Sequence, residues 1–201
     1  MAFNPNRRSG LNPVWVLLAV NTIIYIASIF DQQGVINLRF GLSPSWMIEQ
    51  PWTLFTYMFI HGSIYHLIFN MITLYFFATF IIALVGETAF LMTYFAGGIV
   101  GGLFFILFSY LPLPYFEMTQ YSIVIGASGA IFALGGMLMV LRPNVKVLMF
   151  FVIPMPLWVG ILIGFLLVTF NPGVAWQAHL GGLAYGALIG WYYRRKELRR
   201  F

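Results

Sequence analysis

The sequence predicts an all-α membrane protein, a bundle of six transmembrane helices with both termini in the cytoplasm. Three observations predict this architecture: the apolar composition, six long apolar runs, and basic residues that gather on one side. Of the 201 residues, 61% are hydrophobic and 7% are charged, whereas a soluble domain has about 45–50% apolar and about 25% charged residues. Because a chain of this length cannot bury so much apolar surface in its own core, we expect lipid to cover much of it.

The apolar runs give the predicted helices, since about 20 apolar residues cross a bilayer core of about 30 Å. The second run is long enough to include an interfacial entry, and Pro154 and Pro156 are expected to kink the fifth helix. The amphipathic segment 42–48 is expected to lie along the membrane surface. One membrane domain, 1–201, is predicted, with a cytoplasmic segment at 1–12 and a basic cytoplasmic tail at 194–201. The six predicted spans are 13–30, 53–85, 89–110, 123–141, 147–170 and 174–193.

The distribution of basic residues orients the predicted bundle. If six spans alternate, nine of the ten Lys and Arg residues fall on one face, and only Arg39 falls on the other. Positive residues mark the cytoplasmic face, so both termini are placed there. The net charge of +5 is then a topology signal, and we expect no nucleic-acid partner. The chain has no cysteine, which excludes disulfides, thiol nucleophiles and zinc–thiolate sites.

Three polar residues within the predicted spans are candidates for function, because polar and ionisable groups are unfavourable in hydrocarbon. They are His66 in the second span, Ser128 in the fourth and His179 in the sixth. These spans all run from outside to inside, and each residue lies a few positions below the outer end. The three therefore share a depth of about 8–15 Å. Asn70 follows His66 by one helical turn, so both face the same way.

Small residues on the fourth and sixth spans allow these helices to pack closely. Close packing would bring Ser128 and His179 within hydrogen-bonding reach, at about 2.6–3.2 Å. Packing alone explains the pattern on the sixth span equally well. Gly126 and Gly129 flank the serine, and the sixth span has a small residue at every fourth position: Ala178, Gly182, Gly186 and Gly190.

Three motifs resemble those of the rhomboid family of intramembrane serine proteases. Residues 126–130 read GASGA, like the family's GxSG motif, and residues 178–182 read AHLGG, like its last-helix AHxxG signature. Residues 61–71 read HGSIYHLIFNM, like its H-x4-H-x3-N pattern. The resemblance covers residues 40–191. The sequence departs from the family's common residues at Thr53, Ile82 and Phe132.

The resemblance implies a role for each matching residue. Ser128 would attack the scissile carbonyl, and His179 would take up its proton. The oxyanion would be bound by His66, Asn70 and the Ser128 backbone N–H. A structural role is expected for His61, and no cofactor or metal is expected. The supporting residues of the site are Gly126, Gly129, Phe132 and Gly182.

The function implied is that of an intramembrane serine endopeptidase that cleaves transmembrane-helix substrates near the outer leaflet, in a prokaryotic cell membrane. Its partners would be transmembrane substrates and membrane lipid, and the oligomeric state stays open. The alternative is a rhomboid-like pseudoprotease that binds membrane helices without cleavage. Such proteins normally lack the serine or the histidine, and both are present here.

Other classes fit the residues less well. A channel or transporter should continue its polar residues through the inner leaflet, but the inner halves of the fourth and sixth spans hold Leu, Met, Ala and Gly. A zinc protease needs HExxH or a similar site, and the three histidines have no accompanying carboxylate. An aspartyl protease needs two aspartates, and Asp31 is the single aspartate of the chain.

Overall fold

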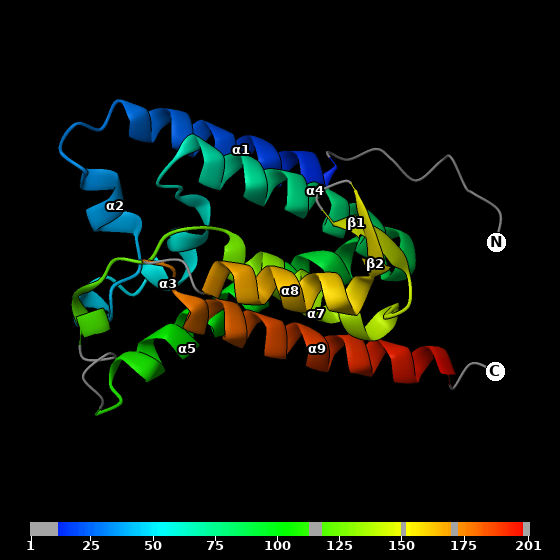
Figure 1. Cartoon of the computed structure of the whole chain (residues 1–201). Coiled ribbons are helices and arrows are strands. Elements are labelled where there is room, and N and C mark those ends of the chain that lie inside the picture. Colours follow the sequence, from blue (N-terminus) through cyan, green and yellow to red (C-terminus); the bar gives the residue numbers. More distant parts are fainter. Residues whose placement is uncertain (1–11, 113–117, 150–151, 170–172, 199–201) are drawn as a thin grey trace.

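The computed structural model describes residues 12–112, 118–149, 152–169 and 173–198. The protein is mostly helical, and its long helices lie side by side (Figure 1). In that view α1, α5 and α8 run in the opposite direction to α4, α7 and α9. The long helices are α1 (Pro13–Ile29), α4 (Ile64–Val85), α5 (Glu87–Ser109), α7 (Ser128–Leu141), α8 (Leu157–Thr169) and α9 (Trp176–Leu198). Shorter elements are α2 (Val35–Phe40), η1 (Pro44–Trp46), α3 (Thr53–Thr56), η2 (Tyr57–Phe59) and η3 (Met118–Tyr121).

Local sequence signals fix several helix ends. Helix α1 begins with a proline after Asn12, whose side chain accepts a hydrogen bond from the Val14 backbone N–H at 2.9 Å. This arrangement satisfies one of the free N–H groups of the first turn. Ser63 caps α4 in the same way by accepting from the His66 N–H at 3.1 Å. Gly86, at φ 95°, separates α4 from α5, a backbone conformation that favours glycine.

The predictions for the first and third spans agree with α1 and α5 to within two residues at each end. The second predicted span divides into α3, η2 and α4, as an interfacial entry before the main helix. Helix α9 continues beyond 193 through Leu198, so the described part of the basic tail is helical. The predicted segment 1–12 lies outside the described residues except for Asn12.

The prediction for the fourth span is wrong at its start, because α7 begins at Ser128 and not at residue 123. The preceding residues are extended and pair with Leu42 through Val124, with two backbone hydrogen bonds of 2.8 and 2.9 Å. Gly126 then takes φ 125°, which no helix allows. Leu42 is fully buried in this pairing, whereas Ile48 at the other end of the segment 42–48 is 91% exposed.

The prediction of an all-α fold is wrong at residues 146–149 and 153–156. These residues form two antiparallel strands, β1 (Lys146–Met149) and β2 (Ile153–Pro156), and the helix of the fifth span begins only at Leu157. Pro154 and Pro156 have no N–H to donate within a helix, and each disfavours helical geometry in the residue before it. The prolines therefore exclude the helix from this segment and do not merely kink it.

Two of the described helices, α4 and α5, are long and apolar enough to cross a membrane by length and composition. Helices α1, α7 and α8 are apolar but have 17, 14 and 13 residues. Helix α9 has 23 residues, with charged residues in its last turns. Length and composition alone therefore identify two spans and not six.

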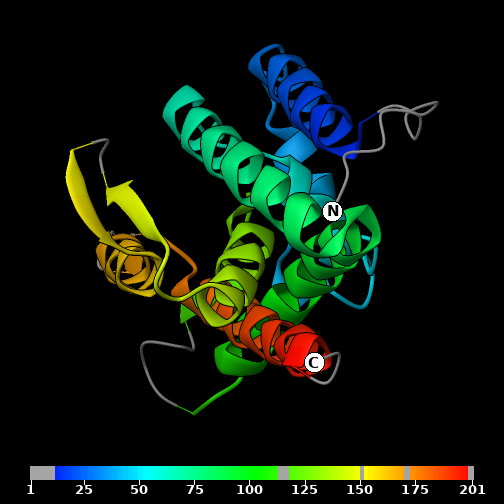
Figure 2. The same cartoon turned by 90° about the vertical axis from the view of Figure 1, so that its right-hand side faces the viewer.

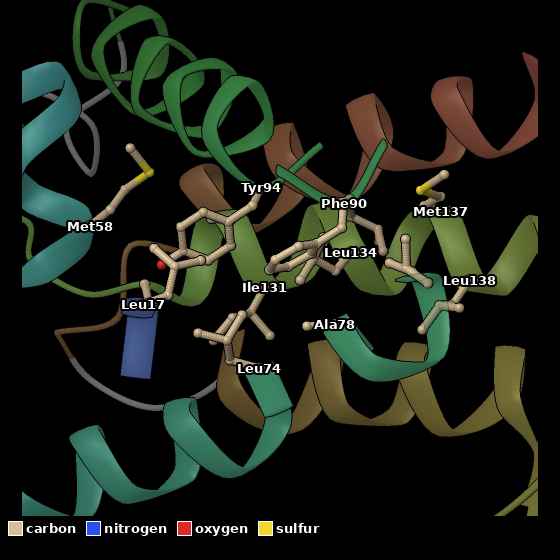
Figure 3. Close-up of a cluster of buried hydrophobic side chains, with 14 of the residues drawn as sticks. Leu17, Met58, Leu74, Ala78, Phe90, Tyr94, Ile131, Leu134, Met137 and Leu138 are labelled. Atoms are coloured by element: carbon tan, nitrogen blue, oxygen red, sulfur yellow. The ribbon is translucent and has the colours of Figure 1, made fainter. Parts of the chain in front are cut away.

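Helix α7 lies at the centre of the bundle, where it packs against α4, α5, α8 and α9 (Figure 2). The core beneath its first turn is shared between helices: Ile131 and Leu134 of α7, Leu74 of α4, and Phe90 and Tyr94 of α5 (Figure 3). All are buried. This packing holds the amino-terminal end of α7 in a fixed position, and that end carries Ser128.

Candidate active site

The first residue of α7 meets the fourth residue of α9. The Ser128 Oγ lies 2.7 Å from the His179 Nε2, a distance typical of a strong hydrogen bond. Ser128 is half-buried and His179 is 6% exposed. If the hydroxyl donates to Nε2, the imidazole proton resides on Nδ1. The Nδ1 atom is buried and has no hydrogen-bond partner among the described residues.

Glycines bring the backbones of α7 and α9 together behind this pair. A Cβ built at Gly182 would overlap the carbonyl oxygen of Gly129, and one at Gly186 would overlap that of Ala133. Gly136 on α7 faces the Leu183 carbonyl in the same way. The small residues therefore permit a backbone-to-backbone approach that a larger side chain would prevent.

His66 lies over the turn that precedes the serine. A Cβ at Gly126 would stand 2.7 Å from both Cε1 and Nε2 of the His66 ring and 3.7 Å from the Ser128 Oγ. The ring is half-buried and packs edge-on against His61 with ring centroids 4.9 Å apart. Because Gly126 has no side chain, the His66 imidazole can lie close to the Ser128 hydroxyl.

Asn70 lies one turn after His66 on α4 and is 7% exposed. Its Nδ2 donates to the backbone carbonyl of His66 at 3.0 Å. A side-chain amide has two N–H donors, so this bond leaves the second for another acceptor. The bond also ties the orientation of Asn70 to the turn that carries His66.

Phe132 contacts the face of the His179 ring, with centroids 4.7 Å apart and planes inclined by 35°. It lies one turn after Ser128 on α7. An aromatic ring at this distance restricts the rotation of the imidazole by packing.

Tyr57 also contacts the turn before Ser128, although the sequence alone does not indicate a role for it. Its backbone carbonyl accepts a hydrogen bond from the Gly126 N–H at 2.9 Å, and its hydroxyl donates to the Gly98 carbonyl of α5 at 2.7 Å. It is 1% exposed. Nothing in the sequence distinguishes it from the other ten tyrosines of the chain, because its importance comes from contacts with distant segments.

The salt bridge that the structure describes lies away from Ser128 and His179. Arg142 and Glu197 form a bidentate ion pair at 3.0 and 3.1 Å, at the ends of α7 and α9 opposite to Ser128 and His179. Among the described residues, no three His, Cys, Asp or Glu side chains are grouped closely enough to hold a metal ion. The polar groups that meet at the pair are a hydroxyl and an imidazole.

Comparison with known proteins places this geometry in a family. The model of the Rhomboid domain matches residues 48–196, which include both residues of the pair and all of α4 to α8. The chain belongs to the rhomboid family. Members of this family are generally intramembrane serine proteases, although some are inactive. Family membership and the apolar helices identify the chain as a membrane protein.

Similar rhomboid proteins come from yeast, a plant and a bacterium. Rhomboid protein 1, mitochondrial, of Saccharomyces cerevisiae is 34% identical over 143 residues, covering 67% of this chain and 39% of that protein. RHOMBOID-like protein 12, mitochondrial, of Arabidopsis thaliana is 32% identical over 202 residues, covering 92% of this chain and 59% of that protein. A Bacillus subtilis protein named as a candidate rhomboid protease, YdcA, is 31% identical over 163 residues, covering 75% of this chain and 71% of that protein.

These relatives bear on length and location. The chain spans 39% and 59% of the lengths of the yeast and plant rhomboids. Both of those relatives are named as mitochondrial, so they do not support the prokaryotic cell membrane expected from the sequence.

Proposed function

We propose that this rhomboid is an intramembrane serine endopeptidase that cleaves transmembrane-helix substrates with Ser128 as nucleophile and His179 as general base. The observation that carries the proposal is the 2.7 Å separation of the Ser128 Oγ and the His179 Nε2. A serine hydroxyl is a weak nucleophile unless an adjacent base removes its proton. Imidazole is the side chain that most often performs this task.

The reaction follows from the two side chains. His179 Nε2 takes the hydroxyl proton while Oγ bonds to the scissile carbonyl carbon, which gives a tetrahedral oxyanion. The C–N bond then breaks, and the proton on Nε2 passes to the leaving amine. Water, activated by the same imidazole, attacks the acyl ester and releases the carboxylate product and the free serine.

In the proposed reaction, three N–H donors would bind the oxyanion. As the first residue of α7, Ser128 has a backbone N–H with no acceptor within the helix, and the helix dipole favours negative charge there. The His66 ring and the free N–H of Asn70 supply side-chain donors from α4. Removing one such donor lowers kcat by about 10²–10³-fold in characterised hydrolases.

The proposed topology has six crossings with both termini in the cytoplasm and the pair near the outer leaflet. The alternating directions of α1, α4, α5, α7, α8 and α9 support it (Figure 1), as does the gathering of basic residues on one side. A substrate helix would enter sideways near α8, where Leu162, Leu166 and Leu167 are exposed.

Cleavage of a single-spanning membrane substrate in liposomes tests the proposal. The wild-type protein is expected to cut within or beside the transmembrane segment, and Ser128→Ala and His179→Ala are expected to cut at least about a thousandfold more slowly. Full cleavage by Ser128→Ala would exclude this serine as nucleophile. Helix binding by the wild type without any cleavage would favour the pseudoprotease.

A further inference from the structure

The hydroxyl of Tyr57 lies where three helices meet. It donates to the Gly98 carbonyl of α5 at 2.7 Å. A Cβ built at Gly129 of α7 would stand 3.2 Å from it and 3.5 Å from the Ala178 carbonyl oxygen of α9. A Cβ at Gly101 of α5 would approach the same two oxygen atoms. One hydroxyl therefore fills the space between α5, α7 and α9.

The helix residues at this junction include the sequence neighbours of the proposed catalytic pair. Gly129 follows Ser128, and Ala178 precedes His179. A shift of either backbone at the junction moves the adjacent side chain by a similar amount. The packing at the Tyr57 hydroxyl is thus coupled to the distance between Oγ and Nε2.

The backbone of Tyr57 contacts the segment that leads into α7. Its carbonyl accepts from the Gly126 N–H at 2.9 Å, which holds Gly126 at φ 125° two residues before Ser128. Tyr57 itself is fixed by η2, which it begins. Side chain and main chain together fix both the entry to α7 and its first turn.

We infer that Tyr57 is a positioning residue whose hydroxyl acts as a spacer between α5, α7 and α9 and sets the Ser128–His179 distance. The inference rests on the proposed protease function for its kinetic consequence. It assigns Tyr57 no contact with substrate. Because a misplacement of about 1 Å can lower a rate by about 100-fold, a small change at the spacer has a measurable effect.

Replacing the tyrosine by phenylalanine removes the hydroxyl and leaves the ring. For Tyr57→Phe, kcat is expected to fall about 10- to 100-fold while KM stays near the wild-type value. The control is Tyr94→Phe, since Tyr94 is also fully buried and packs against Phe90 (Figure 3) and against Phe95. Tyr57→Phe also loses the hydrogen bond to the Gly98 carbonyl, so its thermal stability is expected to fall. A loss of kcat only in Tyr57→Phe, measured below the unfolding transition of both variants, separates positioning from general packing.

A second variant tests the spacer directly. In Gly129→Ala the new methyl group crowds the Tyr57 hydroxyl, and in the double variant with Tyr57→Phe it takes over part of the vacated space. We expect the double variant to have a higher kcat than the product of the two single effects predicts. Independent effects of the two substitutions would overturn the inference.

A structure of Tyr57→Phe provides a readout that does not depend on turnover. The Oγ–Nε2 distance is expected to exceed about 3.2 Å, the limit of an effective nucleophile–base hydrogen bond. An unchanged distance with wild-type kcat would overturn the inference. A wild-type protein without any cleavage activity would instead contradict the proposed function, and the distance in the variant would still decide whether Tyr57 is the spacer.

Discussion

Gly182 of α9 lies so close to Gly129 of α7 that a Cβ on the former would overlap the carbonyl oxygen of the latter. The hydrogen bond between Ser128 and His179 exists because the two backbones approach at this point. Without it, the hydroxyl and the imidazole would be separated by the width of a side chain. The small residues at the helix contact therefore belong to the proposed catalytic arrangement as much as the pair itself.

Gly182→Ala is expected to push α9 away from α7 and to lower both activity and stability. Overpacking of a close contact typically lowers the free energy of unfolding by about 1–3 kcal/mol. Unfolding in detergent and cleavage rates measure the two effects. The matched control is Gly164→Ala on α8, where nothing lies within 4 Å of the new methyl group and a gain of up to about 1 kcal/mol is expected. Wild-type cleavage by Gly182→Ala would show that the approach is not required.

Gly126→Ala is expected to remove most activity, because the methyl group would collide with the His66 ring at 2.7 Å and strain a backbone at φ 125°. Gly34→Ala separates these two causes. Gly34 also has a positive φ, 67°, but has open space around its Cβ position, so only backbone strain of about 1–2 kcal/mol is expected. Cleavage assays on both variants should show a loss of about 100-fold for Gly126→Ala and near-normal rates for Gly34→Ala. Equal rates would exclude the collision with His66 as the cause.

Phe132→Leu is expected to lower kcat by up to about tenfold, since an aromatic contact contributes about 0.5–1.5 kcal/mol beyond burial. The loss arises because the imidazole of His179, 4.7 Å away, gains rotational freedom. Phe132→Tyr should keep most activity because it preserves the ring. The control is Phe80→Leu, for which we expect an unchanged kcat. Phe80 is half-buried and lies near the carboxyl-terminal end of α4. A similar loss in both leucine variants would point to general destabilisation.

Glu197→Gln should leave the cleavage rate unchanged. The substitution breaks the ion pair between Glu197 and Arg142, which lies at the end of the bundle opposite to Ser128. The side chains of Arg142 and Glu197 are 35% and 36% exposed. Ion pairs exposed to this degree contribute about 0–1 kcal/mol, so the unfolding midpoint in detergent should shift only slightly. A large fall in kcat would reveal a coupling between the two ends that the present account lacks.

The sequence predicted the parts of this structure that local pattern controls. Helix α1 follows from an apolar run with a cap and a proline, and α5 follows from an apolar run that ends at a tyrosine and a leucine–proline segment. Ser128 and His179 were identified because polar groups within apolar runs are conspicuous. The small residues on the fourth and sixth spans were the basis for predicting that Ser128 and His179 come together.

Other features depend on contacts between distant segments, which hydropathy does not reveal. Helix α7 begins at Ser128 because Val124 pairs with Leu42 and Gly126 with Tyr57, and both partners lie more than 60 residues earlier. The paired strands β1 and β2 have an apolar sequence like that of a span, and only the two prolines of β2 indicated an interruption. Tyr57 is one of many aromatic residues, so its position between three helices was not predictable from its neighbours in the sequence.

Labelling with a fluorophosphonate probe tests whether Ser128 is activated by His179, because such a probe forms a covalent bond with an activated serine. We expect the wild-type protein to be labelled at Ser128, as located by mass spectrometry of the modified peptide. Ser128→Ala should not be labelled, and His179→Ala should be labelled at least about a thousandfold more slowly. Two results would contradict the claim that these two side chains form the active pair. One is labelling of His179→Ala at the wild-type rate. The other is labelling of Ser128→Ala at another residue with the same yield as the wild-type protein.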